Sequence, residues 1–88
     1  MRLIFTHNAW KDYISWQEAD KKMAGKINEL IKEISRTPFE GKGKPEPLKF
    51  DMTSLWSRRI DKKHRLVYQV LDEDILIYSC RYHYNKVN

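Results

Sequence analysis

Three kinds of side chain in this 88-residue sequence could act together on a phosphodiester: a carboxylate, an imidazole and several fixed cations. Cleaving RNA without a metal needs a base for the ribose 2′-OH proton, an acid for the departing 5′-oxygen, and cations to hold charge on the phosphate. Glu46 is a candidate base, because Pro45 and Pro47 stiffen the backbone on both sides of it. His83 is a candidate acid, because an imidazole exchanges protons near neutral pH.

The candidate cations, Lys49, Arg59 and Arg65, lie between these two positions in the sequence. An arginine guanidinium stays charged and can grip two phosphate oxygens at once. Tyr82 and Tyr84 can stack on unpaired bases, a contact of roughly 1–3 kcal/mol per base. No spacing of His, Cys, Asp and Glu indicates a metal site, so we expect neither a metal nor a cofactor.

Each candidate also has a structural explanation that the residues alone leave open. Glu46 can be a solvated loop acid, and His83 can be an exposed polar residue near the end of the chain. Arg59 and Arg65 can form surface salt bridges, and Tyr84 can belong to the core. The residues by themselves therefore indicate a basic domain that binds RNA or an acidic partner.

The composition predicts a single small domain in a reducing cytoplasm. A chain of 88 residues leaves no room for a second domain. The single cysteine, Cys80, excludes an internal disulfide and a cysteine-based zinc site. The apolar run at residues 3–5 is too short for a signal peptide, and no run approaches the ~20 apolar residues of a membrane span. We expect a cytoplasmic protein that does not associate with membranes.

Positive charge is concentrated in the middle of the sequence. Residues 41–66 contain eight Lys and Arg against three Asp and Glu, whereas residues 1–40 contain seven against six. A basic block of this kind indicates an anionic partner, which could be nucleic acid, an acidic protein or a membrane surface; a merely solvated loop is the alternative. His7 and His64 show no pattern of partners and receive no role.

Two amphipathic helices are predicted after a short strand at residues 3–5. The first covers residues 9–18, with His7 or Asn8 as its N-cap. The second begins after the N-cap Asp20 and ends near residue 35. Its apolar stripe is expected to be core and consists of Met23, Ile27, Leu30, Ile31 and Ile34.

A long loop and three strands complete the prediction. Residues 38–53 contain three prolines and two glycines, which makes regular structure unfavourable and a functional loop expected. Strands are predicted at residues 56–60, 65–71 and 75–84, joined by turns short enough for antiparallel hairpins.

The second hairpin decides which side chains share a face of the sheet. If its turn pairs Leu71 with Ile75, then Arg65, Arg81 and His83 share one face. The opposite face, packed on the helices, would then carry Leu66, Tyr68, Val70, Leu76 and Tyr78.

Five segments carry a resemblance to a known family: residues 26–32, 36–49, 56–60, 64–68 and 80–84. The most specific is the loop Thr-Pro-Phe-Glu-Gly-Lys-Gly-Lys-Pro-Glu-Pro-Leu-Lys. On these motifs the sequence resembles the YoeB (Txe) toxins of the RelE/ParE superfamily over almost its whole length. The resemblance implies a RelE-like α+β fold, with two N-terminal helices packed on one face of a small, twisted, mostly antiparallel sheet.

The resemblance also implies a role for each matching residue. Glu46, in the Pro-Glu-Pro-Leu-Lys motif, would be the general base, and His83, in Tyr-His-Tyr, the general acid. Arg65, in His-Arg-Leu-Val-Tyr, would stabilise the pentacoordinate phosphate. The substrate-binding residues would be Lys49 and Arg59, which orient the phosphate, and Tyr84, which positions the nucleotide.

The implied activity is that of a toxin of a type II toxin–antitoxin system. It would cleave mRNA in the A site of the 70S ribosome, leave a 2′,3′-cyclic phosphate, and so inhibit translation. A YefM-type antitoxin with an acidic, partly disordered segment would neutralise it, and homodimers are a further implication. The alternatives are a non-enzymatic gyrase inhibitor like the ParE branch, which does not use such an acid–base set, and a plain ribosome- or RNA-binding module.

One feature departs from the family. Close relatives tend to stop near the tyrosine that matches Tyr84, whereas this sequence continues for residues 85–88. We therefore expect a single toxin domain over residues 1–84 and a short C-terminal tail. The tail could fray harmlessly, or it could change the pKa of His83 and the access of substrate.

Overall fold

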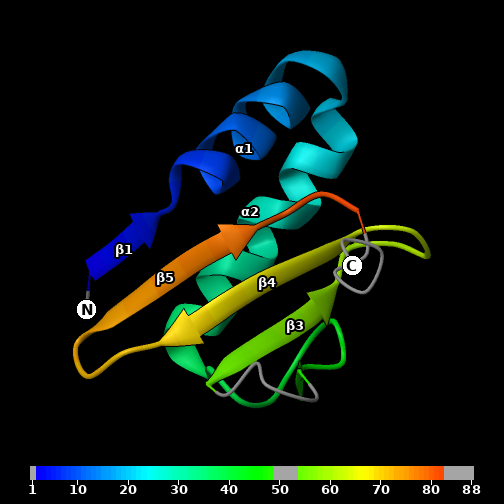
Figure 1. The fold of residues 1–88 in the computed structure, drawn as a ribbon. Helices are drawn as coiled ribbons and strands as arrows, with labels where there is room; N and C mark the ends of the chain where they lie inside the picture. Colours follow the sequence, from blue (N-terminus) through cyan, green and yellow to red (C-terminus); the bar gives the residue numbers. More distant parts are fainter. Residues whose placement is uncertain (1, 49–53, 83–88) are drawn as a thin grey trace.

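Two helices and a five-stranded sheet make up the structure, a computed structural model that describes residues 2–48 and 54–82 (Figure 1). The strand order in the sheet is β1-β5-β4-β3-β2. β1 pairs with β5 in parallel, and the other neighbours pair antiparallel, which confirms the predicted α+β class and mostly antiparallel sheet. The elements along the chain are β1 (Arg2–Phe5), α1 (His7–Ala19), α2 (Lys21–Arg36), β2 (Glu46–Pro47), β3 (Leu55–Arg59), β4 (Arg65–Val70) and β5 (Asp74–Ser79).

Side-chain caps begin both helices. Asp20 caps α2 as predicted, and its carboxylate accepts a hydrogen bond from the backbone N–H of Met23 at 3.1 Å. The predicted cap of α1 was wrong: Thr6, rather than His7 or Asn8, accepts from the N–H of Ala9 at 3.0 Å, so the helix begins earlier than expected. Within the described residues, neither helix combines the length and the apolar character needed to cross a membrane.

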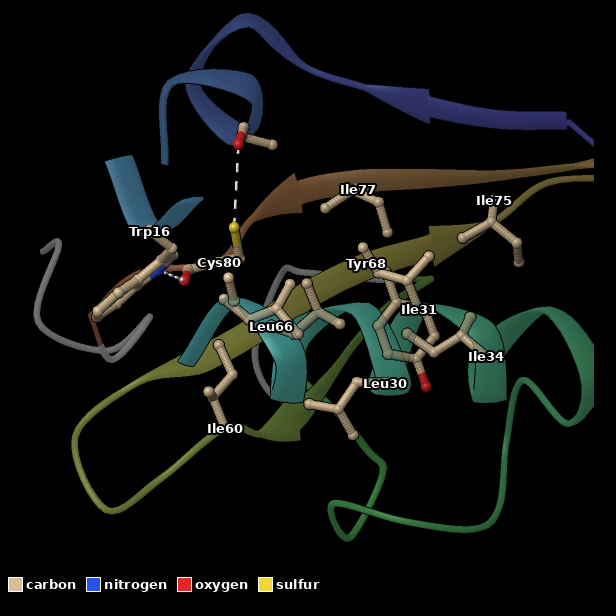
Figure 2. Packing of buried hydrophobic residues seen from close by; sticks show 13 residues of the cluster. Trp16, Leu30, Ile31, Ile34, Ile60, Leu66, Tyr68, Ile75, Ile77 and Cys80 are labelled. Carbon is tan, nitrogen blue, oxygen red and sulfur yellow. Dashed lines mark hydrogen bonds between the residues drawn. The ribbon is translucent and has the colours of Figure 1, made fainter. Parts of the chain in front are cut away.

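The core lies between the helices and one face of the sheet. Figure 2 shows Leu30, Ile31 and Ile34 of α2 against Tyr68 of β4 and Ile77 of β5. These side chains are buried, because one apolar stripe of α2 meets the inward-facing positions of the central strands. The predicted stripe of α2 therefore forms core, with Met23 at its partly buried margin.

The register of the second hairpin differs from the prediction by one residue. Leu71 and Asp74 exchange backbone hydrogen bonds of 2.8 and 3.3 Å, so the turn contains two residues, and Val70 rather than Leu71 pairs with Ile75. A shift of one residue exchanges the two faces of a strand. Ile75 and Ile77 consequently enter the core, whereas Tyr78, predicted to be there, is 41% exposed. Leu76, also predicted on the helix side, alternates with these core positions and lies on the opposite face.

Candidate active site

Three of the predicted site residues lie on the same face of the sheet, the one turned away from the helices. Glu46 of β2 pairs with Ser57 of β3, and Arg59 lies two positions further along β3. Arg59 in turn pairs with Arg65 of β4. Paired residues point to the same side, and alternate residues of one strand do as well, so Glu46, Arg59 and Arg65 share a face.

We call the group of Glu46, Arg59 and Arg65 the Glu46–Arg65 face. The spacing of the strands gives the distances between its members. Arg59 and Arg65 are directly opposite, so their Cβ atoms lie roughly 4.5–5.5 Å apart. Glu46 and Arg59 are diagonal neighbours, roughly 7–8 Å apart. Two strand spacings and two residues of rise separate the Cα atoms of Glu46 and Arg65 by roughly 12 Å. Two long side chains can reach a single phosphate across that distance.

The guanidinium of Arg65 is anchored by the turn between β3 and β4. Its Nη1 donates to the carbonyl oxygens of Asp61 at 2.7 Å and His64 at 3.1 Å. The turn is itself held by the Asp61 carboxylate, which accepts from the N–H groups of Lys63 and His64. Burial acts to raise the pKa of Asp61, but these two N–H bonds and the nearby charges of His64 and Lys26 together lower it. Among the described residues, Nε and Nη2 of Arg65 have no hydrogen-bond partner.

A buried arginine holds the loop that leads to Glu46. Arg58 has no exposed surface, and its guanidinium donates to the carbonyl oxygens of Thr37, Glu40 and Lys42. Its Nε donates to the hydroxyl of Tyr68 at 3.2 Å. Planar guanidinium donors can satisfy several carbonyl groups at once, so one side chain organises the whole turn of chain after α2. The sequence analysis missed this role.

The strand period could have revealed Arg58. It pairs with Leu66 and alternates with Ser57 and Arg59, which places it on the helix side of the sheet. A charged residue at an inward-facing position requires a set of buried partners. Nothing in the sequence, however, indicated that these partners would be the carbonyl groups of the loop.

Gly43 joins this loop to β3. Its carbonyl oxygen accepts from the N–H of Arg59 at 2.7 Å, and its φ of +83° is in the left-handed region. An added Cβ would lie 3.0 Å from the side chain of Leu30 and 3.1 Å from that of Arg58. Glycine is therefore required both by the conformation and by the close packing, and the loop enters β2 at a defined position.

The other predicted site residues, Lys49, His83 and Tyr84, lie outside the described residues. Arg81, two positions before His83, was predicted to share a face with Arg65, and this was wrong. Its guanidinium lies 4.2 Å from the centre of the Trp16 ring and donates to the hydroxyl of Ser15, so it packs on α1. β5 ends at Ser79, and the chain then turns towards the helix.

Among the described residues, we find neither a reactive thiol nor a metal site that could take part in catalysis at the Glu46–Arg65 face. Burial raises the pKa of the Cys80 thiol to about 12, so this residue is not a nucleophile at neutral pH. Within residues 2–48 and 54–82, no group of three or more His, Cys, Asp and Glu is placed to hold a metal ion. A hollow of about 300 Å³ includes Arg59 but neither Glu46 nor Arg65; its lining is Lys26, Glu29, Leu30, Lys42, Gly43, Arg59 and Ile60.

Comparisons with known proteins agree with one another. Residues 5–84 match the family model of the YoeB-like toxins of bacterial type II toxin–antitoxin systems. The chain is 61% identical to Toxin YoeB of Escherichia coli K12 over 84 residues, which cover 96% of this chain and all of that protein. The YoeB dimer of Staphylococcus aureus has a TM-score of 0.90 and 52% identity, covering 96% of this chain and 98% of that one. The YoeB chain of a heterotetrameric YoeB–YefM complex from the same organism has a TM-score of 0.87 and 52% identity, with the same coverage.

Proposed function

The chain belongs to the family of YoeB-like toxins of bacterial type II toxin–antitoxin systems, and from this membership we propose that it is an endoribonuclease that cleaves mRNA in the ribosomal A site. The observation that carries this proposal is the Glu46–Arg65 face. It brings a carboxylate and two guanidinium groups, distant in sequence, to neighbouring positions on three strands. Within the described residues, no ion pair engages Glu46 or Arg59.

The proposed reaction needs no group beyond the side chains and the RNA itself. The Glu46 carboxylate takes the proton from a ribose 2′-OH, and that oxygen attacks the adjacent phosphorus. Arg65 holds the additional negative charge of the pentacoordinate phosphate, with Arg59 and Lys49 orienting it. His83 donates a proton to the 5′-oxygen as its bond to phosphorus breaks. The products are a 2′,3′-cyclic phosphate on the upstream fragment and a 5′-hydroxyl downstream.

The ribosome is expected to supply the alignment that this small surface lacks. In-line attack requires the 2′-oxygen, the phosphorus and the 5′-oxygen to lie nearly on one line, and a flexible RNA seldom adopts that geometry unaided. Among the described residues, the Glu46–Arg65 face offers only two cations, Arg59 and Arg65, to hold the RNA. We therefore assign mRNA and the 70S ribosome as joint partners, and the cytoplasm as the place of action.

An antitoxin of the YefM type is the proposed protein partner. A YoeB relative from Staphylococcus aureus forms a heterotetrameric complex with YefM, and a YoeB dimer from that organism has also been solved. The formal charge of +5 on this chain favours an acidic segment that covers the basic surface. We propose the same antitoxin class and homodimer formation for this protein.

Mapping of cleavage sites tests the proposal directly. Purified toxin is added to 70S ribosomes programmed with a defined mRNA, and primer extension locates the cuts. We expect cuts within the A-site codon, and a 3′ end that polynucleotide kinase must open before it can be ligated. The matched control is the toxin preincubated with its antitoxin, which should leave the mRNA intact.

A gyrase supercoiling assay separates the alternatives. Inhibition of supercoiling with no mRNA cleavage would identify a gyrase inhibitor and overturn the proposal. Binding to ribosomes without cleavage would identify a binding module and also overturn it.

A further inference from the structure

The segment that leads to His83 is held from two sides. From α1, the carboxylate of Asp12 accepts from the N–H of Cys80 at 3.0 Å, and Trp16 Nε1 donates to the Cys80 carbonyl at 2.8 Å. The latter bond is drawn in Figure 2. From the start of β4, the backbone N–H of Arg65 donates to the carbonyl of Tyr82 at 3.2 Å. Tyr82 directly precedes His83 in the chain.

His64 completes this arrangement with its side chain. Its Nδ1 accepts a hydrogen bond of 2.7 Å from the backbone N–H of Tyr82. His64 and Arg65, consecutive in the sequence, thus satisfy both backbone groups of Tyr82. The His64 ring is 8% exposed and packs edge-on against Trp16, with the ring centres 4.9 Å apart.

This bond fixes the protonation state of the imidazole. A backbone N–H can only donate, so Nδ1 must carry a lone pair and the ring must be neutral with its proton on Nε2. Protonation would replace the acceptor by a second donor and break the bond. Tyr82 has a φ of +64°, a conformation that a residue with a side chain adopts only when its surroundings hold it there.

The charges around His64 come from all three elements packed against it. The turn contributes Asp61 and Lys63, α1 contributes Asp12, and the C-terminal segment contributes Arg81. Burial lowers the pKa of His64, and Arg81 and Lys63 act in the same direction, whereas Asp61 and Asp12 oppose them. The net effect keeps the ring neutral at physiological pH, which is the state that the bond to Tyr82 requires.

We propose that His64 is a positioning residue: through its bond to the Tyr82 N–H it fixes the backbone directly before His83 and therefore where His83 meets the substrate. The inference rests on the proposed function only for the role of His83. The hydrogen bond between the Tyr82 N–H and His64 Nδ1 does not depend on which reaction the protein catalyses.

Two substitutions separate the hydrogen bond from ring packing. His64→Phe keeps a planar ring against Trp16 but has no acceptor. His64→Asn presents its side-chain oxygen near the position of Nδ1, so it restores an acceptor that does not titrate. His7→Asn is the matched control, because His7 is exposed at the start of α1. Comparison of ¹H–¹⁵N spectra verifies that each variant is folded.

Hydrogen exchange of the Tyr82 amide is the first measurement. In the wild type we expect protection at pH 8 that falls as the pH decreases through the pKa of His64, below the usual value of about 6.5. His64→Phe should lose this protection at every pH. His64→Asn should retain it without the dependence on pH, and His7→Asn should behave as the wild type. Unchanged protection in His64→Phe would overturn the proposal.

Single-turnover cleavage of ribosome-bound mRNA is the second measurement. We expect His64→Phe to lower the rate constant about 100-fold, the scale of a small misplacement of a reacting group, with little change in apparent ribosome affinity. His64→Asn should restore most of the rate. If His64→Phe loses amide protection yet cleaves at the wild-type rate, the positioning role is wrong. If the wild type does not cleave while the exchange results are as expected, the proposed function fails and the hold on Tyr82 stands.

Discussion

Arg59 and Arg65 lie directly opposite each other on β3 and β4, and no described carboxylate forms an ion pair with either guanidinium. Like charges at directly opposed positions of neighbouring strands destabilise a sheet. The Arg59–Arg65 pair on this outward face therefore does not stabilise the fold. The arrangement is explained when an anion lies between them, as the proposed reaction requires.

Replacement of Arg59 should therefore affect stability and binding in opposite directions. Arg59→Gln removes the repulsion, and we expect it to raise the free energy of unfolding by roughly 0.2–1 kcal/mol at low salt. The gain should vanish near 1 M salt, where charges are screened within about 3 Å. Urea denaturation at the two salt concentrations measures it. Affinity for single-stranded RNA should fall. The slope of the logarithm of the binding constant against the logarithm of the salt concentration should become shallower by about 0.7. A less stable variant at low salt would contradict this account.

Glu46→Gln tests the general base with almost no change in shape. The amide cannot accept the 2′-OH proton at neutral pH, so we expect the rate of cleavage of ribosome-bound mRNA to fall by about 10²–10⁴-fold. Glu46 is exposed, so the melting temperature should be unchanged, and antitoxin binding should persist. Glu40→Gln is the matched control, since Glu40 is an exposed acid of the same loop whose backbone, rather than side chain, contacts Arg58. A Glu46→Gln toxin that still arrests growth would remove Glu46 from the mechanism.

Cleavage should depend strongly on the ribosome. The Glu46–Arg65 face contributes only two cations, Arg59 and Arg65, from the described residues, so most of the positioning must come from elsewhere. We expect naked mRNA to be cut at least about 100-fold more slowly than the same mRNA in a ribosomal complex. Single-turnover assays with and without ribosomes make the comparison. Similar rates in both would show that the toxin aligns its substrate alone.

Arg58→Met should destabilise the protein severely. The substitution keeps much of the stem but removes the guanidinium bonds to the carbonyl groups of Thr37, Glu40 and Lys42. Each hydrogen bond to a charged group contributes about 1.5–3 kcal/mol, so we expect the loss of these bonds to cost about 3 kcal/mol or more. Thermal and urea denaturation measure it. Lys62→Met, an exposed position on the turn between β3 and β4, should change stability by less than about 0.5 kcal/mol.

The pair formed by Arg2 and Asp74 makes a prediction about pH. Arg2 donates two hydrogen bonds, of 2.9 and 3.0 Å, to the Asp74 carboxylate and lowers its pKa. A lowered pKa of an acid stabilises the fold above the unfolded-state pKa, and that contribution disappears as the pH falls through the lowered value. In Arg2→Gln the pKa of Asp74 should return towards its usual value of about 3.9. Carbon-detected NMR titration of the carboxyl group measures it, with Arg36→Gln as the control. An unchanged pKa in Arg2→Gln would contradict the ion pair.

Local sequence patterns determined the two helices, the strands β1, β3 and β4, and most of the core; they missed β2, which lies in the predicted loop, and the end of β5 at Ser79. The stripe from Ile27 to Ile34 and the cap Asp20 depend on residues within a few positions of one another, and both were confirmed. The motifs around Glu46 and Arg65 were sufficient to identify the family, because their loop sequence is so specific.

Only the tertiary structure decided which distant groups meet. The faces of β5 depended on one residue of register, set by the backbone bonds between Leu71 and Asp74. The parallel pairing of β1 with β5, the burial of Arg58 under the loop and the bond from Tyr82 to His64 join residues far apart in the sequence. The periodicity of a sequence indicates which side of a helix or strand a residue faces. It does not indicate which residue of another element that side chain contacts. Those partners are chosen by the packing of the whole chain.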